Sequence, residues 1–264
     1  MLDLVDVDSA KWEAYAADAG FPMRQVWARE ARTLLAFERR AVMHFDAALF
    51  VSAEEAALFT RLAPECAGRV EAVPNGVDLA RFDPAAPWPN PFGAAPALVF
   101  TGTMDYRPNV EAVRWFAAEV MPRLAPLDPA PEFWIVGANP APAVRALEGP
   151  RVRVTGAVPD IRPFLAHAAV SVAPLRIARG IQNKVLEAMA MGRPVLASPQ
   201  AFEGVRAVPG RDLLVEETAE AMAARIAEIL SGAHPGLGPA ARAAVRAGHD
   251  WPAMLAALDP LLPP

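Results

Sequence analysis

The feature that most constrains the fold is a regular alternation of short apolar runs and longer amphipathic stretches over residues 97–231. The apolar runs have the length of strands and mostly lack polar alternation; they span 98–102, 133–137, 152–155, 170–173, 195–198 and 212–215. Such runs are typical of parallel strands that are buried on both faces. Helical patterns separate them at about 109–121, 141–148, 160–168, 181–191 and 217–231. This order predicts an α/β fold with a doubly wound, Rossmann-like parallel sheet.

The first 96 residues follow a different pattern. Strand patterns fall at 2–6, 48–52 and 70–73, and helical patterns at 24–43 and 54–62. The segment 84–96 holds five prolines, which neither a helix nor a central strand tolerates at that density, so it predicts a linker. Three strands make a poor independent α/β domain. The favoured interpretation is therefore the end of a larger, truncated Rossmann-like domain, and the alternative is an extension that packs on the second domain.

The predicted domain organisation has four parts. Residues 1–83 form the N-terminal piece, 84–96 the linker, 97–238 the doubly wound domain and 239–264 two C-terminal helices.

Composition excludes several classes of protein. Apolar residues make up 54% and charged residues 21%, which excludes a disordered polyampholyte. The single cysteine, Cys66, fits a reducing compartment and excludes a cysteine-ligated zinc site. A net charge of −5 argues against binding of nucleic acid by bulk electrostatics. With no apolar run approaching 18 residues and no visible signal peptide, we expect a cytoplasmic protein.

Motif searches remove further functions. There is no Walker A sequence, no GxGxxG after the first strand of the sheet and no GxSxG elbow, which weakens the hypotheses of a kinase, a dehydrogenase or an α/β-hydrolase. The four histidines lack metal-ligand spacing, and we expect them to be ordinary surface or boundary residues.

Two segments at strand ends are candidate binding sites. In FTGTMDYRPN, a buried strand ends in Gly102, where a ligand could approach the backbone, and Arg107 could meet an anion. From the pattern alone, a solvated surface charge is the favoured interpretation of Arg107. The segment PNGVD, at 74–78, contains the strong turn signal Asn-Gly, and an ordinary tight turn is the favoured interpretation.

The segment RGIQNKVLEAMAMGRP, at 179–194, is the most informative. Gly180 precedes a predicted helix whose first amides favour an anion. Lys184 is one of only two lysines in the chain, and it lies three residues before Glu187, so both occupy one helix face. A lysine here can pair with a diphosphate, and a carboxylate one turn later can accept hydrogen bonds from a ribose diol. The alternative is a plain Lys–Glu surface pair.

The segments PNGVD, VFTGTMDYRPN, VTGAVPDIRPFLAHAAVSVAPL and GIQNKVLEAMAMGRPVLAS together resemble a known family. They are similar to the carboxyl-terminal half of the GT-B retaining glycosyltransferases of family 4, and more narrowly to sugar transferases associated with exopolysaccharide gene clusters. The resemblance covers nearly the whole chain and is most specific at 180–198. It implies that most of the N-terminal, acceptor-binding domain is absent from this chain.

The resemblance also implies a set of donor-binding residues. Gly102 and Thr103 would let the diphosphate lie close to the backbone, Gly156 and Val158 would flank the base, and Glu187 would accept the ribose hydroxyls. The groups that would hold the diphosphate are Lys184, Arg107 and the amides of Gly180, Ile181 and Gln182. Arg179 stands where the family commonly has a first glutamate, which puts the sugar contact in doubt and suggests added phosphate charge instead. No catalytic nucleophile is implied, and neither a metal nor a cofactor is expected.

The function implied is transfer of a sugar, with retention, from a nucleotide-diphosphate sugar to a saccharide or lipid-linked acceptor in polysaccharide biosynthesis. The alternative is a non-catalytic donor-binding remnant, or half of a split enzyme that needs a partner chain for the missing N-terminal half. Because such acceptors are often lipid-linked, the arginines of 24–40 could contact the inner face of a membrane, although the same stretch carries Glu30 and Glu38. A solvated or domain-facing helix is the favoured interpretation there, and no nucleic-acid partner is expected.

Overall fold

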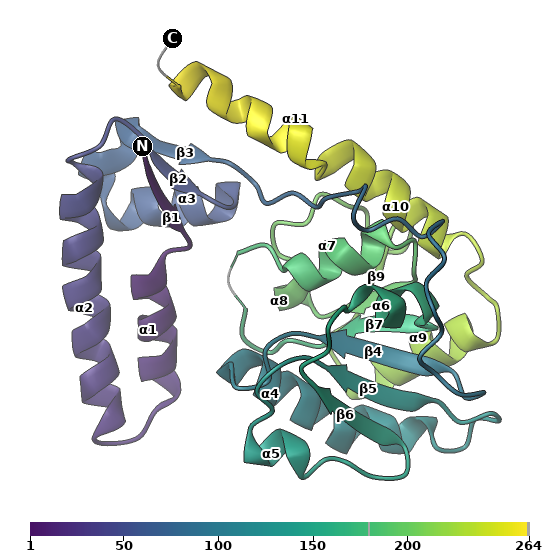
Figure 1. The fold of residues 1–264 in the computed structure, drawn as a ribbon. Helices are drawn as coiled ribbons and strands as arrows, with labels where there is room; N and C mark the ends of the chain where they lie inside the picture. The colour runs from purple at the N-terminus through teal and green to yellow at the C-terminus, as the bar shows by residue number, and fades with distance from the viewer. Residues whose placement is uncertain (179, 263–264) are drawn as a thin grey trace. The chain divides into compact units, whose positions relative to one another are not determined.

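The computed structural model describes residues 1–178 and 180–262, and these form two compact units (Figure 1). The first unit comprises residues 1–75, 180–181 and 252–262, and the second comprises residues 76–178 and 182–251.

The first unit is built on a small parallel sheet in the order β1-β2-β3. Its strands are β1 (Leu2–Val5), β2 (Ala48–Phe50) and β3 (Val70–Ala72). Its helices are α1 (Asp8–Asp18), α2 (Met23–Val42) and α3 (Ala53–Leu62), followed by a 3-10 turn at Pro64–Arg69. The three predicted strands and the two predicted helices of this region are therefore confirmed.

Helix α1 was not predicted from the sequence. It has no side-chain cap at Val7, so it lacks the usual start signal. Its stability comes instead from α2, which lies alongside it (Figure 1). The hydroxyl of Ser9 donates to a Glu38 carboxylate oxygen at 2.6 Å, and the ring centroids of Tyr15 and Trp27 are 5.7 Å apart.

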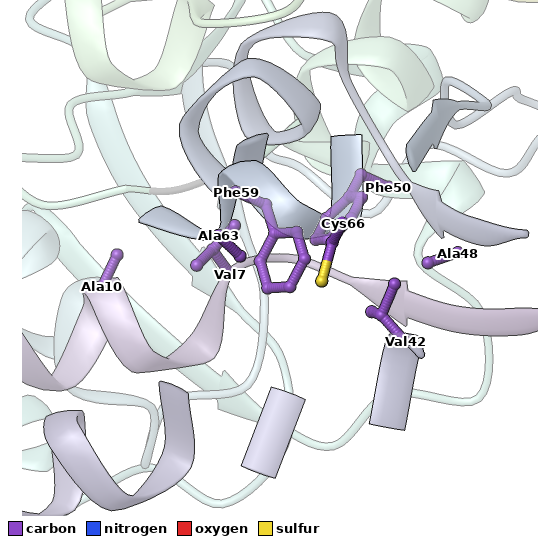
Figure 2. Packing of buried hydrophobic residues seen from close by; sticks show 8 residues of the cluster. All are labelled: Val7, Ala10, Val42, Ala48, Phe50, Phe59, Ala63 and Cys66. Carbon is purple, nitrogen blue, oxygen red and sulfur yellow. The ribbon is translucent and has the colours of Figure 1, made fainter. Parts of the chain in front are cut away.

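Apolar side chains from the strands and helices meet in the core of the first unit (Figure 2). The rings of Phe50 on β2 and Phe59 on α3 lie 5.0 Å apart between centroids. Cys66 is fully buried beside them, and burial raises the pKa of its thiol. The cysteine is thus part of the hydrophobic packing.

The second unit contains a six-stranded, all-parallel sheet in the order β6-β5-β4-β7-β8-β9. The strands are β4 (Ala97–Thr101), β5 (Glu132–Val136), β6 (Val152–Gly156), β7 (Val170–Ala173), β8 (Val195–Ala197) and β9 (Leu214–Val215). From β4 the chain adds β5 and β6 on one side, and it then returns to add β7, β8 and β9 on the other, so the strand order reverses between β4 and β7. This is the switch point of a doubly wound fold. The predicted fold class is confirmed.

Helices cover both faces of this sheet, with α4, α5 and α9 on one and α6, α7 and α10 on the other (Figure 1). They are α4 (Arg107–Trp115), α5 (Pro142–Arg145), α6 (Arg162–His167), α7 (Asn183–Ala190), α8 (Pro199–Phe202), α9 (Ala219–Leu230) and α10 (Leu237–Gly248). Helix α4 continues through a π turn at Phe116–Val120 and a 3-10 turn at Met121–Leu124. After α10 the chain forms α11 (Trp251–Leu255) and a 3-10 turn at Ala256–Leu261.

The boundary between the units falls after Asn75, eight residues earlier than the predicted end of the N-terminal piece. Two contacts hold the intervening segment on the second unit: the Val77 N–H donates to the His249 carbonyl at 2.8 Å, and Arg242 donates to the Phe82 carbonyl at 2.9 Å. His249 is fully buried, so the prediction of a surface or boundary position is wrong for this histidine.

The Pro-rich segment 84–96 has no helix or strand, as expected of a linker, but it also lies against the second unit. The ring of Phe92 meets that of Trp134 on β5 edge-on at 5.0 Å. The C-terminal residues do not form one piece either, because α10 belongs to the second unit and residues 252–262 to the first. In the described part of the chain, no helix is long and apolar enough to cross a membrane.

Candidate functional site

The switch point between β4 and β7 brings two loops to the same edge of the sheet. Ligands bind at the carboxyl ends of the strands in doubly wound folds, because the loops there diverge and leave a crevice. The loop after β4 contains Gly102 and Thr103, and the loop after β7 leads to α7, which carries Lys184 and Glu187. The fold therefore places these predicted residues at one site.

Glycines occupy the carboxyl ends of three neighbouring strands at this edge. Gly102, Gly137 and Gly156 come at the ends of the neighbouring strands β4, β5 and β6, and their φ angles are +154°, +151° and +70°. A Cβ built on Gly137 would lie 1.7 Å from the Gly102 carbonyl oxygen, so only glycine fits there. Sequence analysis missed Gly137 as a site residue, although FWIVG ends in glycine just as LVFTG does.

Lys184 is held at the site by contacts that are remote in sequence. Its ammonium donates to the Asn109 side-chain oxygen at 2.5 Å and lies 4.2 Å from the centroid of the Phe100 ring. The amide nitrogen of Asn109 in turn donates to the Thr103 carbonyl at 2.9 Å. Asn109 thus connects the β4 loop to the lysine of α7.

The same contacts explain the glycine at position 102. A Cβ there would lie 2.7 Å from the Asn109 amide nitrogen and 3.3 Å from the Lys184 ammonium. The helical pattern predicted from the sequence begins at about residue 109, but α4 begins at Arg107, and the buried Asn109 lies inside its first turn with its side chain aimed at the site.

The charges at the site are strongly perturbed. Burial lowers the pKa of Lys184 to about 7, against the opposing effect of the Glu187 carboxylate. Burial also raises the pKa of Glu187 to about 7, and the charges of Arg81 and Lys184 oppose that shift. Neither group is fully ionised at neutral pH. Perturbed pKa values of this kind are common at binding and catalytic sites. Arg81 was not predicted, since it follows the PNGVD turn far from α7 in sequence.

The remaining predicted residues are less closely connected. Arg107 pairs with Glu111 at 2.7 Å along α4. Gly156 is the last residue of β6, at the edge of the sheet, and Val158 follows in the next loop. Helix α7 begins at Asn183 with Gln182 as its cap, so the amides predicted at 180–182 precede its first turn. Gly180 and Ile181 group with the first unit. Arg179 lies outside the described residues.

The site can neutralise an anion and bind a diol. Lys184 supplies a cation at the N-terminal turn of α7, where the helix dipole also favours negative charge. Glu187, one turn later, is an acceptor for hydroxyl groups. Within the described residues, no group of three or more His, Cys, Asp or Glu side chains is placed to hold a metal ion.

Comparison with known proteins gives a consistent result. The family model of "Glycosyl transferases group 1" matches residues 95–232, just over half of the chain. A search of curated proteins finds no match.

Solved structures with a similar fold include a glycosyltransferase from Rickettsia africae ESF-5, with 16% identity and a TM-score of 0.66 over 80% of this chain and 61% of that one. A sucrose-phosphate synthase from Thermosynechococcus elongatus has 23% identity and a TM-score of 0.69 over 87% and 61%. HepE from Anabaena, solved in complex with UDP and glucose, has 14% identity and a TM-score of 0.71 over 87% and 66%.

At these identities the likenesses show the fold, and the parallel α/β sheets match the Rossmann-like domains of GT-B glycosyltransferases. The chain spans about six tenths of the length of the first two of these structures.

Proposed function

Because the chain belongs to the family of group 1 glycosyl transferases, we propose that it binds a nucleotide-diphosphate sugar at the β4–β7 switch point and transfers the sugar to a saccharide or lipid-linked acceptor. The observation that supports the proposal is the arrangement of Lys184, Asn109 and Gly102, with Glu187 one turn along α7. It brings together a cation for the phosphates, a glycine that lets the ligand approach the backbone and a carboxylate that can accept hydrogen bonds from a diol.

In the proposed complex, the donor diphosphate lies against Gly102 and Thr103 and meets the ammonium of Lys184. Charge that develops on the leaving diphosphate is then stabilised by groups that are already in position, which is the usual source of rate enhancement where no protein nucleophile takes part. Arg107 adds a second cation if it exchanges Glu111 for phosphate.

Glu187 is proposed to accept the two ribose hydroxyls. Its pKa of about 7 in the unliganded site means that binding must favour the ionised form, and the positive charges of Arg81 and Lys184 act in that direction. The loop with Gly156 and Val158 is proposed to flank the base, and the amide of Gln182, which caps α7, is proposed to add to the diphosphate contacts.

Further details are proposals that follow from the resemblance described above. They are membership of family 4, retention of anomeric configuration, independence of metal ions, and a role in exopolysaccharide synthesis. A location in the cytoplasm, with peripheral contact of α2 at the inner membrane face, belongs with them. HepE was solved with UDP and glucose, which supports UDP as the first nucleotide to test.

A second candidate is a donor-binding module that does not catalyse transfer alone and needs a partner chain for the acceptor side. The observation that favours it is that Gly102, Asn109, Lys184 and Glu187 all lie in the second unit, so the proposed donor site draws on that unit alone. Both candidates require the donor site, and only the first requires turnover by this chain.

Calorimetric titration with UDP and GDP tests the donor site. Glu187→Ala should weaken binding of the preferred nucleotide about ten-fold or more, because a charge-assisted hydrogen bond to the ribose is worth roughly 1.5–3 kcal/mol. The matched control is Glu148→Ala, which removes an exposed glutamate at a distance from the β4–β7 edge and should leave binding unchanged.

The proposal fails if the folded chain binds neither nucleotide, or if Glu187→Ala binds as tightly as the parent. Release of glucose from UDP-glucose, followed by NMR of the anomeric proton, separates the two candidates. Turnover with an α product supports a retaining transferase, and tight binding without turnover supports the donor-binding module.

A further inference from the structure

A cavity in the second unit is lined by three arginines and has a volume of about 440 Å³. Three of its lining residues are Arg193, Arg242 and Arg246, and the remainder are small or apolar: Pro84, Met191, Gly192, Pro239 and Ala243. Among the residues that the structure describes, no carboxylate lines this cavity. Its lining therefore carries a concentrated positive charge.

The cavity lies away from the proposed donor site. Arg193 comes two residues before β8 begins, so it lies at the amino-terminal edge of the sheet, whereas Lys184 serves the carboxyl edge. Met191 and Gly192 follow the C-terminal end of α7, while Lys184 lies in the first turn of that eight-residue helix. At 1.5 Å per residue, α7 separates its two ends by about 12 Å.

The walls of the cavity are rigidly built. A Cβ on Gly238, at the start of α10, would lie 2.1 Å from the Gly192 carbonyl oxygen, so α10 packs directly on the turn that follows α7. Arg242 of α10 donates to the carbonyls of Phe82 and Ala190. These bonds hold the Arg242 guanidinium in one place and cap the negative, carbonyl end of α7.

The other two arginines have their charges available for a ligand. In the described part of the chain, neither Arg193 nor Arg246 has a hydrogen bond or ion pair through its guanidinium. Burial lowers the pKa of Arg193, and no neighbouring carboxylate opposes that shift. Burial also lowers the pKa of Arg242. The Asp83 carboxylate at 3.5 Å opposes that shift, and the charge of Arg246 adds to it.

An arrangement of this kind is unfavourable until an anion enters. Three like charges around one cavity repel one another, and Asp83, which lies 3.5 Å from Arg242, offsets at most one of them. Guanidinium groups bind phosphate oxygens with two parallel N–H donors, which makes arginine the preferred residue for phosphate recognition. We propose that this cavity is a second binding site, for a phosphate group carried by a small molecule or by a lipid headgroup, distinct from the donor site.

Titration with pyrophosphate tests the site. The double variant Arg193→Gln/Arg246→Gln should weaken binding at least ten-fold, because both available guanidinium groups are lost. The matched control is Arg24→Gln/Arg114→Gln, which removes the same charge from exposed arginines outside the cavity and should leave binding unchanged. Lys184→Met should retain this binding, because it alters only the proposed donor site.

Sedimentation with phosphatidylglycerol vesicles, compared with phosphatidylcholine vesicles, identifies the source of the phosphate. Pyrophosphate binding that the double variant loses supports a soluble ligand. Vesicle binding alone, lost in the same variant, supports a lipid headgroup. Arg246→Gln by itself is the second variant if the double variant does not fold, since Arg246 is exposed and should be replaceable without loss of the fold.

The proposal is overturned if the folded parent binds neither probe, if the double variant binds as the parent does, or if Lys184→Met alone removes the binding. It does not depend on the donor-site proposal, because its variants lie at the other edge of the sheet.

Discussion

Donor binding should exchange protons with solvent, and the direction of exchange should reverse near pH 7. In the unliganded site the pKa values of Lys184 and Glu187 are both about 7. The proposed complex needs the lysine charged for the diphosphate and the carboxylate ionised for the ribose. Binding must therefore protonate the fraction of Lys184 that is neutral at a given pH. It must also deprotonate the fraction of Glu187 that is protonated at that pH.

The magnitudes follow from the two pKa values. At pH 8 about 0.9 of Lys184 is neutral and about 0.1 of Glu187 is protonated, so binding should take up about 0.8 proton. At pH 6 the fractions are reversed, and binding should release about 0.8 proton. At pH 7 the two effects cancel, and the affinity should be highest there, about three-fold above its values at pH 6 and 8.

Calorimetry in pairs of buffers with different ionisation enthalpies measures this exchange. UDP-glucose is the suitable ligand, because its esterified diphosphate has no group that titrates near pH 6, unlike a phosphate monoester. Lys184→Met should abolish proton uptake at pH 8. The control is Lys11→Met, which removes the other lysine of the chain and should leave the exchange unchanged.

Two results would refute the reasoning. Binding without proton exchange at pH 6 and pH 8 would mean that the two side chains keep their ionisation on binding. Uptake at pH 8 that persists in Lys184→Met would mean that another group titrates, and the lysine would then have no part in the diphosphate contact.

Three other predictions concern single positions. Gly137→Ala should destabilise the chain by about 3 kcal/mol or more in chemical denaturation, since its Cβ would overlap the Gly102 carbonyl oxygen at a φ of +151°. Asn109→Leu should weaken donor binding about ten-fold by calorimetry, because the hydrogen bond that positions Lys184 is lost. Burial raises the pKa of Glu38 in the folded chain. The stability that its proton contributes is therefore fully present below the pKa of the unfolded chain, and it is lost as the pH rises through the pKa of the folded chain. Glu38→Gln should therefore lower the free energy of unfolding more at pH 4 than at pH 7.

Local pattern was sufficient for much of the fold. The apolar runs at 98–102 and 133–137 became β4 and β5, because a strand buried on both faces must be apolar at every position. Predicted helices at 141–148 and 160–168 were longer than α5 and α6 as observed, since helix ends depend on contacts that periodicity does not report.

The candidate site was predictable where its residues are close in sequence. Lys184 and Glu187 are three residues apart on one helix, and spacing alone places them on one face. Gly102 was found because it ends a buried strand. The family resemblance, and not the spacing, suggested the roles of Gly156 and Val158, which stay predictions.

Partners that are distant in sequence were not predictable. Asn109 meets Lys184 across 75 positions, and this contact exists only because β4 and β7 are neighbours in the sheet. Arg81 acts on Glu187 across more than 100 positions of the chain. The cavity likewise brings Arg193 close to Arg242 and Arg246, which lie about 50 positions later. Neither contact could be predicted from local pattern.

By itself, the sequence determined the type of the larger unit, its strand segments and one helix face of the site. Those properties depend on burial and hydrogen bonding among near neighbours. Such local interactions give the apolar residues a regular spacing that can be read from the sequence. Only the tertiary structure decided which charges are buried together, because desolvation and Coulomb interaction depend on distance in space. Two such groups can be far apart in the chain and still meet where parallel strands lie side by side.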